Sequence, residues 1–145
     1  MTTATKPLKK VPDPFSLGLN VTDSLLVHQA LLAGLPFSSF VKFETASKLA
    51  RARLASIISV APRTLDRRQK EKRLKSDESE RLFRVANLYR LATELFNGDE
   101  AAAAHWMEAP RPALGGIAPL ELARTEVGGR RVETLIGQLE HGVYV

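Results

Sequence analysis

The sequence contains no cysteine among its 145 residues. That absence excludes a disulfide framework, a thiolate nucleophile and a cysteine-ligated zinc site, and it is typical of proteins from a reducing compartment. Long apolar runs are missing too, because no stretch approaches the roughly 20 apolar residues that a membrane-spanning helix needs. The first residues also lack the apolar segment of a secretory signal. We therefore expect a cytoplasmic protein that does not enter a membrane.

Signatures of catalysis are also missing. The three histidines, His28, His105 and His141, fall in separate segments, and none has a partner at a metal-ligand spacing such as H-x-x-x-H. The sequence has no G-x-S-x-G elbow, no Walker loop and no dinucleotide-binding fingerprint. We expect no catalytic residue, no metal site and no cofactor, and therefore a protein that works by binding.

The alternation of apolar and polar residues that indicates a half-buried strand is not sustained in any segment. Apolar residues instead recur at helical spacing, and 44% apolar with 26% charged residues is close to globular averages. The pattern predicts an all-α fold with helices over residues 21–33, 37–48, 82–96, 100–108 and 119–126 (ended by Gly128 and Gly129), a helix pair around Leu54 and Leu65 whose second helix begins at Pro62, and a last helix with Val132, Leu135, Ile136 and Leu139 on one face. The predicted caps are Asp23 or Ser24 for the first helix and Asp99 for 100–108, and Asn97-Gly98 is expected to end the helix over 82–96, whose apolar stripe includes Leu82, Val85 and Tyr89.

The charge is distributed unevenly along the chain. Residues 51–75 hold nine Lys/Arg and two Asp/Glu, whereas residues 76–145 hold seven Lys/Arg and eleven Asp/Glu. A basic segment followed by an acidic one suggests two surfaces for two partners, the first of them a polyanion, although a solvated helix face would also explain the basic run. With three early prolines among lysines, we expect a flexible arm over residues 1–20, then units over 21–75 and 76–145.

The basic segment has the spacing of a helix-turn-helix. Ala55 is the small residue of the first helix, Ser59 lies at the turn, and Leu65 is the apolar anchor of the second helix. Glycine is commoner than serine at such a turn, and Ala61 stands where a hydroxyl cap is usual. The spacing predicts a DNA-binding unit, with a purely structural helix pair as the alternative.

The second helix of this pair would present polar and basic side chains to DNA. Arginine matches both phosphate oxygens and the guanine edge, and the start of a recognition helix is where base edges are usually reached. Since operators of this class are two-fold symmetric, a homodimer is expected. The residues we expect to contact operator DNA are Arg63, Thr64, Arg67, Arg68 and Lys70.

The last third of the chain carries a connected set of motifs. They are Arg81-Leu82, Leu95-Phe96 with Gly98, Ala104-His105-Trp106-Met107 with Pro110, Ala113-Leu114-Gly115-Gly116, Pro119-Leu120-Glu121-Leu122, Gly128, Val132, Leu135 and the ending Glu140-His141-Gly142-Val143-Tyr144. Together they resemble the C-terminal toxin-binding domain of the Xre/MbcA/ParS antitoxins, and Arg63 to Arg68 is similar to the helix-turn-helix of the same family.

This resemblance implies an antitoxin that binds and neutralises a toxin, typically an NAD-consuming toxin of the RES-domain type. It also implies repression of the protein's own operon and a toxin–antitoxin hetero-oligomer. Two other functions remain open. One is a stand-alone transcription regulator whose C-terminal unit dimerises or senses a ligand, and the other is an inhibitor whose helix-turn-helix serves assembly only.

The resemblance and the apolar ending together select candidate toxin contacts: Leu114, Gly115, Gly116, Arg130, His141, Val143, Tyr144 and Val145. Alternatives exist for several of them. The two glycines can simply form a tight turn, Arg130 can pair with Glu126 or Glu133, and the tail can pack back on the chain instead of inserting into the toxin. Trp106 is expected in the core, with an interface anchor as the alternative.

Overall fold

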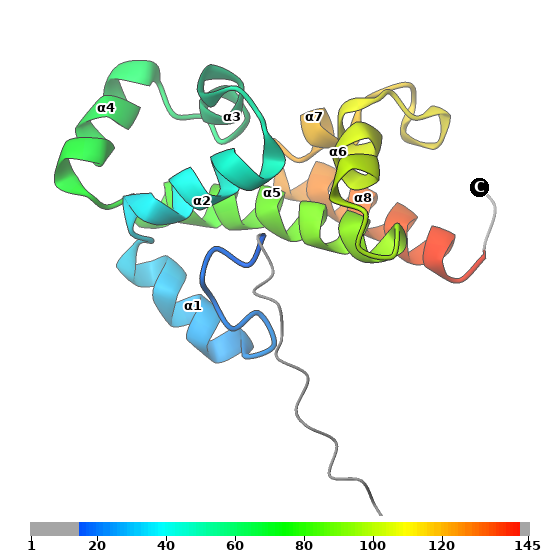
Figure 1. The fold of residues 1–145 in the computed structure, drawn as a ribbon, viewed down its shortest axis with the longest axis horizontal. Coiled ribbons are helices and arrows are strands. Elements are labelled where there is room, and N and C mark those ends of the chain that lie inside the picture. Colours follow the sequence, from blue (N-terminus) through cyan, green and yellow to red (C-terminus); the bar gives the residue numbers. More distant parts are fainter. Residues whose placement is uncertain (1–14, 143–145) are drawn as a thin grey trace, which may run out of the picture.

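A computed structural model describes residues 15–142 of the chain. The elements are α1 (Ser24–Ala33), α2 (Phe37–Ser47), α3 (Arg51–Ile57), α4 (Pro62–Glu71), α5 (Ser76–Leu95), α6 (Glu100–Glu108), the 3-10 turn η1 (Pro112–Leu114), α7 (Pro119–Leu122) and α8 (Glu126–Glu140) (Figure 1). Over these described residues the only β-type pairings are two isolated bridges. The all-α prediction is confirmed.

Two predicted helix starts and one predicted helix end are also confirmed. The Asp23 carboxylate accepts hydrogen bonds from the first amides of α1, and Asp99 accepts one from Ala102 in α6. Asn97 and Gly98 both have positive φ where α5 ends, as expected for residues that tolerate the left-handed region. Local chemistry therefore defines these boundaries.

Helix α5 is the central element of the molecule. It crosses the view in Figure 1 from left to right, with α1 to α4 toward its N-terminal end and α6 to α8 toward its C-terminal end. It contacts α1, α2, α6 and α8. Its predicted apolar stripe is buried, including Leu82, Val85 and Tyr89. Because the same helix lies against elements from both halves of the chain, it joins them through one core.

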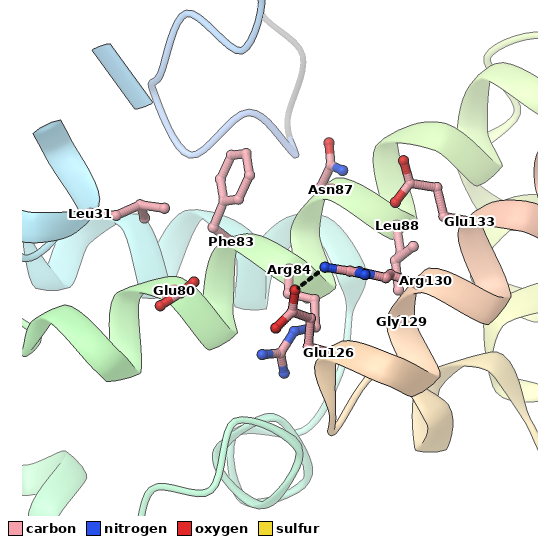
Figure 2. Close-up of a pocket in the computed structure, with 10 residues that line it drawn as sticks. All are labelled: Leu31, Glu80, Phe83, Arg84, Asn87, Leu88, Glu126, Gly129, Arg130 and Glu133. Atoms are coloured by element: carbon pink, nitrogen blue, oxygen red, sulfur yellow. Dashed lines mark hydrogen bonds and ion pairs between the residues drawn. The ribbon is translucent and has the colours of Figure 1, made fainter. Parts of the chain in front are cut away.

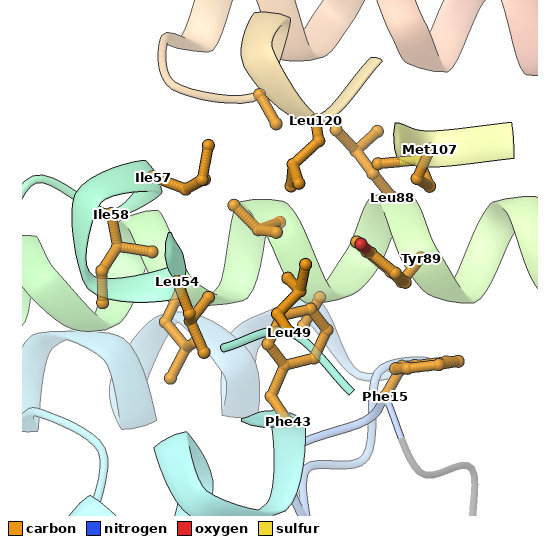
Figure 3. Packing of buried hydrophobic residues seen from close by; sticks show 14 of the residues in the cluster. Phe15, Phe43, Leu49, Leu54, Ile57, Ile58, Leu88, Tyr89, Met107 and Leu120 are labelled. Carbon is orange, nitrogen blue, oxygen red and sulfur yellow. The ribbon is translucent and has the colours of Figure 1, made fainter. Parts of the chain in front are cut away.

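That shared core is visible in the packing of buried side chains (Figure 3). Leu54 and Ile57 of α3 and Phe43 of α2 belong to the same cluster as Met107 of α6 and Leu120 of α7. Burial of such side chains is the main favourable contribution to folding. The basic and acidic halves of the sequence therefore share their hydrophobic stabilisation.

The arm predicted over residues 1–20 extends too far. Phe15 and Leu17 are buried, and the Phe15 ring lies 5.9 Å from the Phe43 ring and 5.5 Å from the Tyr89 ring, centroid to centroid. The Ser39 hydroxyl donates a hydrogen bond of 3.2 Å to the Leu17 carbonyl. Residues 15–20 therefore belong to the folded unit, because aromatic packing outweighs the local effect of the prolines; residues 1–14 lie outside the described residues.

The predicted helix end at Gly128 and Gly129 is wrong. Helix α7 ends at Leu122, and both glycines lie in the first turn of α8, which Thr125 caps by accepting a hydrogen bond from the Gly128 amide. A Cβ atom on Gly128 would overlap the Leu122 carbonyl oxygen, and one on Gly129 would lie 3.1 Å from Arg84 Cδ. Gly128 therefore permits close packing at the α7–α8 corner, Gly129 permits close packing of α8 against α5, and neither glycine terminates a helix.

Candidate nucleic-acid and partner interfaces

Helices α3 and α4 form the predicted helix-turn-helix. Ala55 and Leu65 are buried, Leu54 and Ile58 pack inward, and the Val60 amide donates a hydrogen bond of 2.9 Å to the Ala55 carbonyl. Ser59 has a φ of 57°, which is the left-handed conformation that the turn requires. Local spacing was sufficient to predict this motif, because each of its key contacts joins residues close in sequence.

Helix α4 exposes most of the side chains expected to contact DNA. Arg63, Arg67 and Lys70 are exposed, and Thr64 is half-buried. Pro62 occupies the first turn as predicted, and Ala61 provides no side-chain cap. The Arg67 guanidinium lies 3.7 Å from the Glu71 carboxylate in an exposed pair, which solvent weakens. These side chains are therefore available to an external anion.

The structure corrects the prediction for Arg68. Only 7% of this residue is exposed, and its Nε donates a hydrogen bond of 2.7 Å to Glu78 Oε1. Glu78, in the first turn of α5, also accepts a hydrogen bond of 2.8 Å from the Lys75 amide. Arg68 therefore connects α4 to α5 through this ion pair, and its side chain is not available to DNA.

Electrostatics at this buried pair favour the charged forms. Burial raises the pKa of Glu78, but the hydrogen bond from Arg68, the Lys75 amide and the Arg68 charge outweigh it, so the pKa lies below its ordinary value. The same hydrogen bond raises the pKa of the Arg68 guanidinium. The pair therefore stays ionised at neutral pH.

Arg51 is a structural residue that the sequence did not single out. Its Nε and Nη2 donate hydrogen bonds of 2.7 and 2.8 Å to the Glu44 carboxylate, and its Nη1 donates one of 3.2 Å to Gln69. Its guanidinium carbon lies 5.6 Å from the Phe37 ring centroid and 5.5 Å from that of Phe40. Arg51 thereby connects α2, α3 and α4. The sequence did not indicate this role, because Arg51 is one of many basic residues in the same segment.

Three further contacts connect the helix-turn-helix to the C-terminal half. Arg124, just after α7, donates a hydrogen bond of 2.8 Å to the Ser56 carbonyl of α3. Arg53 lies 2.9 Å from the Glu121 carboxylate, and Arg81 of α5 donates a hydrogen bond of 2.6 Å to the Ile58 carbonyl. Part of the basic charge therefore binds acceptors within the chain.

The loop before α7 is closed by backbone hydrogen bonds. The Arg111 amide donates to the Ile117 carbonyl at 3.2 Å, and the Gly116 amide donates to the Arg111 carbonyl at 2.9 Å. Gly115 and Gly116 have φ values of 71° and 80°, are exposed, and have no neighbouring atom within 4 Å of an added Cβ. The two glycines therefore form a tight turn, and their outer surface is open to a partner.

Leu114 does not share that exposure. Only 3% of it is exposed, and it belongs to the hydrophobic core. Its side chain is therefore directed inward, so the prediction that Leu114 contacts a toxin is corrected. In the sequence Leu114 belongs to the same motif as Gly115 and Gly116, but in the structure Leu114 is buried and the two glycines are exposed.

Trp106 is buried in the core, as predicted. The Arg111 guanidinium carbon lies 5.4 Å from the Trp106 ring centroid, and Arg111 Nε donates a hydrogen bond of 3.3 Å to the Trp106 carbonyl. Arg111 therefore holds the loop before α7 against α6. The sequence did not indicate this role, because the contact depends on how the chain bends after α6.

Arg130 lies on an exposed part of α8 and pairs with Glu126 at 2.7 Å, which is one of the two pairings considered for it. Both residues line a groove of about 310 Å³ between α1, α5 and α8, whose apolar wall includes Leu31 and Phe83 (Figure 2). His141 is exposed at the C-terminal end of α8. The other candidates, Val143, Tyr144 and Val145, lie outside the described residues.

Over residues 15–142, no group of three or more His, Asp or Glu residues is placed to hold a metal ion. Nor is any helix within this range long and apolar enough to cross a membrane. The buried Tyr89 hydroxyl has no hydrogen-bond partner within the described part of the chain, and burial raises its pKa. It therefore stays protonated at neutral pH.

Comparison with known families gives two matches along the chain. The helix-turn-helix domain described as Antitoxin Xre-like matches residues 26–87. The C-terminal toxin-binding domain described as Antitoxin Xre/MbcA/ParS matches residues 91–142. The two matches meet within α5, the helix that both halves of the core share.

Individual relatives are similar over most of their length. The chain is 35% identical to Antitoxin Xre of Photorhabdus laumondii over 81% of this chain and 80% of the relative. It is 30% identical to Antitoxin Xre of Yersinia enterocolitica over 88% and 87%, respectively. It is 29% identical to Antitoxin Xre of Pseudomonas putida over 80% and 72%. These are antitoxins and not enzymes.

Proposed function

Because this chain belongs to the Xre family of antitoxins, we propose that it neutralises an NAD-consuming toxin of the RES type and represses its own operon. The observation that carries the proposal is the placement of two exposed surfaces on one shared core. The first is the basic face of α4, and the second is formed by the loop before α7 and by α8.

DNA binding is assigned to residues 21–75 in this proposal. Arg63, Arg67 and Lys70 supply the charges, and Thr64 lies at the start of the same helix. Cations on an exposed helix attract the DNA backbone, and the N-terminal part of a recognition helix is where bases are read. A homodimer is the matching assembly, because a two-fold symmetric operator is read by a two-fold symmetric protein.

Toxin binding is assigned to residues 76–145. Gly115 and Gly116 offer open backbone, while Arg130 and His141 are exposed side chains on α8 and at its end. An open glycine pair lets another chain approach the backbone closely. The ending Val143-Tyr144-Val145 is proposed to enter the toxin's cleft, because tyrosine combines a large apolar ring with a hydrogen-bonding tip.

The toxin assignment is tested by co-expression with the toxin encoded next to this chain. A tagged antitoxin is expected to capture the toxin, and the purified toxin is expected to consume NAD until the antitoxin is added. Deletion of residues 143–145 should restore NAD consumption, whereas the matched variant R63A/R67A should inhibit as the wild type does. Failure of the wild-type chain to capture the toxin would overturn the assignment.

The DNA assignment is tested by fluorescence anisotropy with the operon's upstream DNA. Affinity is expected to fall steeply with salt, because binding releases counterions from the phosphates. If DNA binds but no toxin is captured, the stand-alone regulator is the better description. If the toxin is captured but no DNA binds at the lowest salt, the helix-turn-helix serves assembly only.

A further inference from the structure

Asp66 is an acidic residue on the outer face of α4, the recognition helix of the proposed DNA-binding unit. It lies three residues after Arg63 and four residues before Lys70, so the three side chains are neighbours on one face of the helix. Leu65 and Arg68, on the inner face, are buried, whereas Asp66 is exposed. The carboxylate therefore lies on the same side of α4 as the cations that are expected to bind DNA.

Contacts within the fold do not account for this acid. Over residues 15–142 the Asp66 carboxylate has no hydrogen bond and no ion pair, whereas Glu71, the other acid of α4, pairs with Arg67. The pKa of the Arg51 guanidinium is raised chiefly by its hydrogen bond to Glu44 and least by the Asp66 charge. The helix dipole stabilises acids in the first turn, but Asp66 is the fifth residue of α4. Neither ion pairing nor the dipole therefore explains an acid at this position.

An unpaired carboxylate on a DNA-binding face repels every DNA sequence, because the duplex carries one negative charge per about 1.7 Å of its axis. A hydrogen bond from a base can offset this repulsion. In the major groove cytosine offers its N4 amino donor, whereas guanine offers two acceptors, thymine one acceptor, and adenine an acceptor beside its donor. Cytosine is therefore the base that suits a carboxylate.

We propose that Asp66 is a specificity-determining residue that accepts a hydrogen bond from the N4 amino group of a cytosine in the major groove of the operator. The inference rests on the proposed DNA binding by α4. Asp66 lies about 4.5 Å from Arg63 along the helix axis, at 1.5 Å per residue, and successive bases of a strand are about 3.4 Å apart. Asp66 therefore reads a base pair next to the one that Arg63 reaches.

The surroundings of Asp66 leave room for a base edge. An open hollow of about 410 Å³ adjoins it and is lined by Asp66, Gln69 and Lys70. The side-chain oxygen of Gln69 accepts a hydrogen bond of 3.2 Å from Arg51, which holds Gln69 at the border of this hollow. Arg63 and Lys70 are exposed on either side of Asp66, and their charges reduce the cost of bringing a carboxylate near phosphates. The carboxylate is thus accessible to a base and flanked by cations.

Selection from a randomised library of DNA duplexes tests this role with the full chain. The wild type should enrich a motif that has cytosine at one position, and replacing that C·G pair should weaken binding by about 5- to 100-fold in fluorescence anisotropy. D66N should enrich adenine at the same position, because asparagine binds the N6 and N7 atoms of adenine. D66A should show no preference at that position.

Affinity for DNA of random sequence is a second readout, and it should change in the opposite direction. D66N and D66A should bind such DNA more tightly than the wild type at low salt, because each removes a charge that the phosphates repel. The matched control D77N removes a carboxylate that is 71% exposed on α5, and it should leave the selected motif unchanged. Thermal unfolding checks that each variant is folded. Partial unfolding would weaken binding to all DNA, so it cannot mimic this result.

The contradicting outcomes are distinct. If D66N and D66A select the same motif as the wild type, Asp66 reads no base and the inference is overturned, even when both variants bind all DNA more tightly. It is also overturned if the position that changes is not a cytosine in the wild-type motif. If the wild type binds no DNA at the lowest salt, the proposed DNA binding itself fails, and the inference fails with it.

Discussion

Neighbouring arginines of the recognition helix illustrate how position decides the role of a side chain. Arg67 and Arg68 differ by one helical step of about 100°, and that step takes the guanidinium from solvent to a buried pair with Glu78. In the same region, Arg51 and Arg53 bind carboxylates of other helices. The number of basic residues in the segment was correct. That number could not separate the side chains that face solvent from those that form ion pairs within the fold, because the ion pairs join residues from different helices.

Single alanine variants should separate these two roles. R67A is expected to weaken DNA binding and reduce the salt slope by about one, with unchanged stability. R68A is expected to lower the free energy of unfolding by about 2–3 kcal/mol, because it leaves the buried Glu78 carboxylate without its ion partner. Anisotropy and urea denaturation measure the two effects. An R68A variant as stable as the wild type would contradict the role of Arg68 in holding α4 against α5.

Acid should weaken the same buried pair. Since the pKa of Glu78 is lowered in the folded chain, the unfolded chain binds the proton more tightly. The stabilisation is therefore complete above the unfolded pKa of about 4.3 and is lost as pH falls through the lower folded value. The difference in unfolding free energy between the wild type and E78Q isolates this group. That difference should shrink as pH falls from 6 to 3, and a constant difference would contradict the account.

At the scale of elements, the helix-turn-helix depends on a turn that serine fits poorly. Ser59 adopts a φ of 57°, a conformation that costs an L-residue with a side chain more than glycine. S59G is therefore expected to raise the free energy of unfolding by about 0.5–1 kcal/mol. The matched change A52G, at an exposed position inside α3, should lower it by about 1 kcal/mol. Urea denaturation measures the stability of both variants. If S59G lowers the free energy of unfolding, the claim that Ser59 is strained at this turn is wrong.

The corner between α7 and α8 depends on Gly128. G128A is expected to lower the free energy of unfolding by about 1–3 kcal/mol, because its methyl group would overlap the Leu122 carbonyl. G137A, in the same helix but with open space around its Cβ, should be neutral or stabilising by up to about 1 kcal/mol. Thermal unfolding compares the pair. Equal effects of the two substitutions would show that the corner is not closely packed.

These elements also show which features the sequence could predict. The turn at Ser59 and the cap at Asp23 follow from residues within one helical turn of each other, and both were predicted. The α7–α8 corner was misread because glycine is a common helix terminator, and the contact that requires Gly128 comes from the preceding helix. Leu114 was wrongly assigned as a toxin contact, because the sequence of a motif does not show which of its side chains are buried in the core.

At the scale of the whole molecule, α5 and the contacts of Arg124 and Arg53 join the two halves into one core. We therefore expect a single cooperative unfolding transition. Trp106 is the only tryptophan in the sequence and reports on the C-terminal half, whereas far-UV circular dichroism reports on all helices. The two urea curves should coincide. A tryptophan transition at a different midpoint would show that the halves unfold separately.

The central claim is that one chain neutralises a toxin with one surface while another surface binds DNA. Its most direct test is the growth of cells that express the adjacent toxin together with the wild-type chain, the R63A/R67A variant or the chain without residues 143–145. We predict that the wild type and R63A/R67A restore growth and that the deletion does not. Failure of the wild-type chain to restore growth would contradict the account.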